Sequence, residues 1–120
     1  MKIIILTKSF EDGEKLKDSI SNMHEDFSSI NNYNKNQILS NPRQFKNTNF
    51  IFSSWYMPIF TEEEVKMCFP ALIAVFYAAG STKYFAKNFI NRGVRVFSAA
   101  RANAIPVAEF VTAQIFHSLG

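Results

Sequence analysis

Short runs of apolar residues alternate along the chain with stretches in which apolar residues recur every three or four positions. The runs have the length of strands and are apolar at consecutive positions, which is typical of strands covered on both faces. Because each run is followed by a helical pattern, the sequence predicts an α/β sandwich with a parallel sheet between two layers of helices. The four clear strands are Ile3–Leu6, Phe50–Ser53, Ile73–Phe76 and Val94–Phe97.

The first helix is predicted directly after the first strand, where Leu16, Ile20 and Met23 have helical spacing, although Gly13 weakens its start. The stretch that follows is rich in Asn and Ser and has the weakest pattern of the chain. We expect two elements in it, a short strand near Phe27–Ile30 and a helical turn around Ile38–Phe45.

Two further helices follow the next two strands. Thr61 and Glu64 form a capping box, in which a hydroxyl and a carboxylate bind the free N–H groups at a helix start, and Pro70 ends that helix. The stretch Ser81–Gly93 is predicted to be helical, with Gly93 as its end. Its apolar pairs, four residues apart, are Phe85 with Phe89 and Ala86 with Ile90.

The most apolar pattern lies at Ile105–Phe116, "IPVAEFVTAQIF", which predicts a long hydrophobic helix with Pro106 in its first turn. Its polar residues form only a narrow strip around Glu109, Thr112 and His117. A helix that is apolar nearly all round must be buried on more than one side. One face of a sheet is not enough to cover it.

Composition narrows the class of protein. The 120 residues are 48% hydrophobic, as expected for one folded domain, and the net charge of +3 is spread over scattered basic residues, so we expect no nucleic-acid partner. The opening apolar run is too short for a signal peptide or a membrane span. A single cysteine, Cys68, forms no internal disulfide and suggests no zinc site. We expect a cytoplasmic protein without membrane contact or a metal centre.

Alternating strands and helices of this kind favour a flavodoxin-like fold, in which ligands bind beyond the carboxyl ends of the strands. Three segments fall there, and their candidate substrate-binding residues are Trp55, Tyr56, Ala78, Ala79, Gly80, Ser81 and Asn103. The loop of small residues offers backbone N–H groups, which suit a carboxylate. Structural roles are open too: Gly80 permits a tight turn with Ser81 or Thr82 as a helix cap, and Asn103 caps the last helix. Trp55 and Tyr56 fit a pocket wall or a core position equally.

The second half of the chain resembles the N-terminal half of the D-isomer-specific 2-hydroxyacid dehydrogenase family. The resemblance lies in "FPALIAVFYAAGSTKYFAKNFINRGVRVFSAARANAIPVAEFVTAQI", which follows the family's order of a strand ending in a glycine loop, a helix, a strand and a long helix. The matching residues are Ala79, Gly80, Gly93, Asn103, Val107, Ala108 and Glu109. This sequence departs from the common pattern at Ser81 and Thr82, which leaves the substrate class open.

The resemblance implies an NAD- or NADP-dependent enzyme that interconverts 2-oxo and 2-hydroxy acids, with residues 1–104 in its substrate domain. Residues 105–120 would form an interdomain or dimerisation helix leading into a dinucleotide-binding domain. Asn103 would reach the substrate or the nicotinamide. The family's glycine-rich NAD motif and its catalytic arginine, acidic residue and histidine are absent here. We therefore expect no catalysis and no tight cofactor binding by this chain alone. A stand-alone flavodoxin-like binding or signalling module is the alternative.

The apolar pattern of Ile105–Phe116 predicts a homodimer. Fully burying each large apolar side chain stabilises a protein by roughly 1.5–3 kcal/mol, so exposure of several of them is costly and a two-fold contact would cover them. We expect light scattering at tens of micromolar to give the mass of a dimer, whereas the double variant Phe110→Asp with Ile115→Asp should be a monomer. A monomeric parent chain would contradict the prediction.

Overall fold

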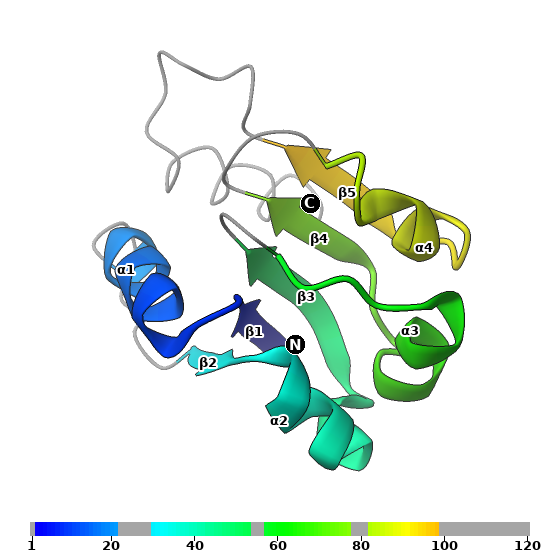
Figure 1. Cartoon of the computed structure of the whole chain (residues 1–120), viewed down its shortest axis with the longest axis horizontal. Coiled ribbons are helices and arrows are strands. Elements are labelled where there is room, and N and C mark those ends of the chain that lie inside the picture. The colour runs from blue at the N-terminus through cyan, green and yellow to red at the C-terminus, as the bar shows by residue number, and fades with distance from the viewer. Residues whose placement is uncertain (1, 22–29, 54–56, 78–81, 99–120) are drawn as a thin grey trace.

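Five parallel strands form a single sheet in the order β2-β1-β3-β4-β5 (Figure 1). The computed structural model describes residues 2–21, 30–53, 57–77 and 82–98. The strands are β1 (Lys2–Leu6), β2 (Asn31–Tyr33), β3 (Thr48–Ser53), β4 (Ala74–Tyr77) and β5 (Arg95–Ser98). The helices are α1 (Phe10–Ser21), α2 (Lys35–Ser40), the short 3-10 helix η2 (Pro42–Phe45), α3 (Glu62–Cys68) and α4 (Ala86–Ile90). The expected α/β class with a parallel sheet is confirmed.

Consecutive residues of the central strands point to opposite faces of the sheet, and both faces are buried. On one face the strand residues pack with residues of α2, α3 and α4. On the other face they pack with Leu16 of α1 and with Ile30. In β3, for example, Ile51 belongs to the first cluster and Phe50 and Phe52 belong to the second. The sheet is therefore the middle layer of three.

Side-chain caps and a glycine turn determine where the helices begin and end. The predicted capping box of α3 is confirmed, because Thr61 Oγ1 accepts from the Glu64 N–H at 3.1 Å and Glu64 Oε1 accepts from the Thr61 N–H at 2.9 Å. Gly93 ends α4 with a φ of 83°. Its N–H donates to the Ile90 carbonyl, and the Val94 N–H donates to the Phe89 carbonyl. These two bonds are those of a Schellman motif, in which glycine avoids the strain of a positive φ.

The four clear strands lie within two residues of their predicted bounds, whereas the second strand lies further along the chain than predicted. The short strand was expected near Phe27–Ile30, but β2 covers Asn31–Tyr33, and Ile30, the described residue of that range, precedes it. The strand lies at the edge of the sheet, so an alternation of apolar residues is not needed to form it. The helical turn expected at Ile38–Phe45 is present as α2 and η2, and α2 begins earlier, at Lys35.

The predicted helix Ser81–Gly93 is much shorter in the structure. Hydrogen-bonded turns from Lys83 precede α4, which covers only Ala86–Ile90. The Phe85 and Phe89 side chains are buried as expected, but Ile90 is 56% exposed. No side-chain hydrogen bond caps α4 at Phe85, the residue before its start. The long helix predicted at Ile105–Phe116 lies outside the described residues. None of the helices in the described part of the chain is long and apolar enough to span a membrane.

Gly13 allows α1 to lie against the edge strand. A Cβ atom at this position would overlap the side chain of Asn32 in β2. The Asn32 Nδ2 group donates to the Phe10 carbonyl at 2.9 Å, at the first residue of α1. The glycine that weakens the helix in the sequence pattern therefore makes room for a hydrogen bond between the helix and the sheet.

Substitution of Gly13 should reveal this coupling. Glycine costs a helix interior roughly 0.5–1 kcal/mol relative to alanine, but Gly13→Ala displaces Asn32, and a lost hydrogen bond costs about as much. We expect Gly13→Ala alone to change the free energy of unfolding by less than about 0.5 kcal/mol, and to stabilise an Asn32→Ala background by about 1 kcal/mol. Urea denaturation of the parent chain, the two single variants and the double variant measures this double-mutant cycle. Equal effects in both backgrounds would show that Asn32 and Gly13 are independent.

Candidate functional site

The carboxyl ends of three neighbouring strands end in a row of residues with hydroxyl groups. In the register of the sheet, Ser53 of β3 lies beside Tyr77 of β4, and Tyr77 lies beside Ser98 of β5. Neighbouring strands are about 4.8 Å apart, so the chain leaves the sheet at three closely spaced points. The three segments identified in the sequence begin at these residues and are Ser53–Pro58, Tyr77–Thr82 and Ser98–Asn103.

Ser53 has a structural role at this edge. Its side chain is fully buried, and its Oγ donates to the Leu6 carbonyl of β1 at 2.6 Å. The bond satisfies a buried hydroxyl and ties the ends of two adjacent strands together. Ser53 is therefore committed to the sheet and is a poor candidate for a nucleophile.

Two tyrosines lie on either side of the segment 78–81 in the sequence and contact each other in space. The hydroxyl oxygens of Tyr77 and Tyr84 are 3.2 Å apart, and their rings meet edge to face with centroids 6.4 Å apart. Tyr77 is buried, whereas Tyr84 is 45% exposed. The pair links Tyr77, which directly precedes residues 78–81, to Tyr84, which follows them by three positions. The contact therefore holds the two residues that flank this segment close together. It also brings an accessible phenol to the edge of the sheet.

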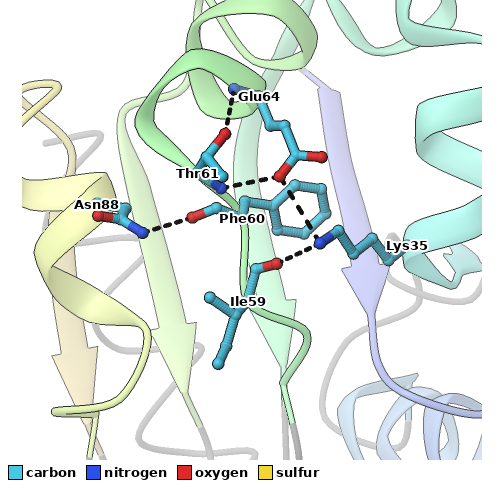
Figure 2. Close-up of polar contacts among 6 residues, drawn as sticks. All are labelled: Lys35, Ile59, Phe60, Thr61, Glu64 and Asn88. Atoms are coloured by element: carbon cyan, nitrogen blue, oxygen red, sulfur yellow. Dashed lines mark hydrogen bonds and ion pairs between the residues drawn. The ribbon is translucent and has the colours of Figure 1, made fainter.

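The segment that follows Tyr56 is held in place by a lysine from α2 (Figure 2). Lys35 Nζ donates to the Ile59 carbonyl at 2.6 Å and lies 3.6 Å from Glu64 Oε1, the same oxygen that caps α3. The ammonium group also lies 5.3 Å from the centre of the Phe60 ring. The Lys35 ammonium group thus makes three contacts here: with the backbone carbonyl of Ile59, with the Glu64 carboxylate that caps α3, and with the face of the Phe60 ring.

Asn88 of α4 holds the next residue from the other side. Its Nδ2 group donates to the Phe60 carbonyl at 2.7 Å (Figure 2). The Phe60 ring is fully buried, and it meets the rings of Phe69 and Phe89 edge to face. Residues 57–61 are therefore fixed by a buried aromatic anchor and two polar contacts, and Trp55 and Tyr56 directly precede this rigid stretch in the sequence.

Nucleophilic and metal chemistry have little support in the described part of the chain. Cys68 is fully buried in α3; this burial raises the pKa of its thiol, and the negative charge of Glu64 raises it further. A thiol of this kind is protonated at neutral pH and unreactive. Residues 2–21, 30–53, 57–77 and 82–98 contain no group of three His, Cys, Asp or Glu side chains arranged to hold a metal ion.

The candidate site residues taken from the sequence lie outside the described residues: Trp55, Tyr56, Ala78, Ala79, Gly80, Ser81 and Asn103. What the structure establishes is the arrangement of the strand ends from which these segments depart. Sequence reasoning missed the supporting residues Lys35, Tyr84 and Asn88. Tyr84 had a weak signal, because it is an aromatic residue close behind a small-residue loop. Lys35 and Asn88 had none, since their partners are far away in the sequence.

Comparison with known proteins gives no relative for this chain. No family model, no curated protein and no solved structure matches it.

The Asn88 contact can be tested against a neighbouring asparagine. Asn88→Ala removes the donor to the Phe60 carbonyl, which costs about 1–3 kcal/mol, and a gain in helix propensity of about 0.5 kcal/mol offsets part of this loss. We expect the free energy of unfolding to fall by about 1 kcal/mol in urea denaturation. Asn91→Ala is the control, because its Nδ2 makes only an exposed 3.3 Å contact with Glu62 and should change stability by less than about 0.5 kcal/mol. If the two variants lose the same stability, Asn88 does not anchor this segment.

Proposed function

We propose that the chain is the substrate-domain portion of an NAD- or NADP-dependent D-2-hydroxyacid dehydrogenase. In this proposal it supplies loops that bind the carboxylate of a 2-oxo or 2-hydroxy acid, while the dinucleotide-binding domain supplies the cofactor and the catalytic residues. Asn103 then contacts the substrate or the nicotinamide, and Ile105–Phe116 forms the interdomain and dimer helix.

The observation that carries the proposal is the register of Ser53, Tyr77 and Ser98 at one edge of the sheet. The three segments that hold the candidate substrate-binding residues start from these neighbouring strand ends. A substrate site shared by the three segments requires such a start. The strand order β2-β1-β3-β4-β5, all parallel, is that of flavodoxin-like proteins, whose ligands bind at this edge.

The local chemistry favours an anionic substrate. Residues 78–81 have small side chains, and in this proposal their backbone N–H groups donate to the carboxylate, since N–H groups bind anions strongly. Tyr84 is 45% exposed close behind this segment, and its hydroxyl, which lies 3.2 Å from that of Tyr77, is a further candidate donor. A stand-alone flavodoxin-like binding module is the second candidate, and the same strand order favours it equally.

Binding of 2-oxo acids by the 120-residue chain tests the proposal. We expect pyruvate to shift the backbone amide signals of residues 54–56, 78–81 and 103 in a saturable way. Pyruvamide, in which an uncharged amide replaces the carboxylate, is the matched control and should shift none of them. Calorimetry with NADH should show no tight binding, because the glycine turn that holds a pyrophosphate is absent from this sequence.

Two outcomes would contradict the proposal. Shifts that are equal for pyruvate and pyruvamide would remove the carboxylate site, and sub-micromolar binding of NADH would mean that the chain contains a cofactor site of its own. The DNA downstream of the codon for Gly120 separates the two candidate functions, because a reading frame that encodes G-x-G-x-x-G favours the dehydrogenase and its absence favours the module.

A further inference from the structure

A pocket lies at the same edge of the sheet, at the ends of β1, β2 and β3. Its volume is about 380 Å³, and it is lined by Lys8, Asn34, Lys35, Asn36, Pro58 and Ile59. Lys8 follows β1, the asparagines and Lys35 begin the connection after β2, and Pro58 and Ile59 follow β3. Pro58 and Ile59 belong to the connection after β3 that also carries Trp55 and Tyr56, whereas the other four lining residues come from the connections after β1 and β2.

The topology makes this position a crevice. The chain passes from β1 to α1 on one face of the sheet and from β3 to α3 on the other face, although β1 and β3 are neighbours. Where adjacent parallel strands send their connections to opposite faces, a gap opens beyond the strand ends, and ligands of open α/β sheets bind in this gap. The volume falls in the range of about 300–1,000 Å³ found for small-molecule sites.

The described lining combines basic, amide and apolar residues. Among these six residues are two lysines and two asparagines, and none of the six is acidic. Lys35 Nζ has three N–H donors; one of them is used by the Ile59 carbonyl, and the neighbouring Glu64 lies at 3.6 Å. Ile59, next to Pro58 in the chain, is an apolar lining residue that is 51% exposed.

We propose that this pocket binds the phosphate group of a small organic phosphate. The phosphate lies between the ammonium groups of Lys8 and Lys35, since lysine binds phosphate as a compact point charge. Asn36 also lines the pocket and is exposed, and in this proposal it donates to the phosphate through its side-chain amide. The organic part of the ligand contacts Pro58 and Ile59, which accounts for an exposed isoleucine beside two lysines.

A second open pocket provides an internal control. It has a volume of about 580 Å³ and is lined by Lys46, Glu63, Lys66, Met67 and Pro70. It also has two lysines, but it includes a carboxylate, and its residues Lys46 and Pro70 belong to the connections that lead into β3 and β4. It therefore lies away from the carboxyl ends of the strands. If lysine pairs alone attracted phosphate, both pockets would bind it.

The test follows backbone amide signals of the full chain during titration at constant ionic strength. The probes are phenyl phosphate, inorganic phosphate and phenol. We expect phenyl phosphate to give saturable shifts at Lys8, Lys35, Asn36 and Ile59, inorganic phosphate to bind the same residues more weakly, and phenol to bind none of them.

Two substitutions at exposed positions identify the contacts. Lys8→Gln should weaken phenyl phosphate binding about fivefold, the effect of losing one exposed charge pair, and Ile59→Ala should weaken phenyl phosphate but not inorganic phosphate. Lys66→Gln in the second pocket is the matched control and should change neither affinity.

Three outcomes would overturn the proposal. The first is a set of shifts that do not saturate or that appear equally at Lys46 and Lys66. The second is unchanged binding of phenyl phosphate by Lys8→Gln. The third is equal affinity for phenyl phosphate and inorganic phosphate, which would leave an anion site without a contact for an organic group.

Discussion

Burial of β1, β3 and β4 on both faces is the constraint on which the rest of the structure depends. A strand with apolar residues at successive positions must have a hydrophobic layer above and below it. Parallel strands meet this condition, because each connecting helix crosses over one face of the sheet before the next strand begins. Phe52 and Phe76, which contact each other at a centroid distance of 5.6 Å, lie on one face, and Ile51 and Val75 lie on the other.

The same constraint determines where chemistry can take place. In a sheet whose strands all run in one direction, every carboxyl end lies at one edge, so polar residues and loops gather there. Ser53, Tyr77 and Ser98 end neighbouring strands in register, and the pocket with Lys8 and Lys35 lies at the same edge, beyond β1 and β3. Residues 57–61 follow the end of β3 in the chain, contribute Pro58 and Ile59 to the pocket, and are held rigidly by Lys35 and Asn88. Both proposed binding sites therefore rely on one well-anchored connection.

Local signals predicted the elements that depend on local physics. The capping box at Thr61 and Glu64 spans four residues, and the glycine stop at Gly93 needs only one turn of helix, so both were visible in the sequence and are present. The prediction failed where a segment depends on distant partners. The strand β2 consists of Asn31–Tyr33, whose pattern is polar, and it forms because β1 offers an unpaired edge.

The candidate site shows the same difference between features that local sequence signals predict and features that depend on distant partners. The sequence identified residues 54–56 and 78–81 as following strand ends, and the strands before them end side by side at Ser53 and Tyr77. It did not identify Lys35 or Tyr84 as their supports.

By itself, the sequence determined the class of fold, the approximate bounds of four strands, and one helix start and one helix end, because these follow from the spacing of apolar residues and from hydrogen bonds within a single turn. Only the tertiary structure decided the order of the strands, the contact of Lys35 with the Ile59 carbonyl and the fit of Gly13 against Asn32. Those features join residues that are about 20 or more positions apart, and such pairs come together only when the sheet has brought their strands side by side.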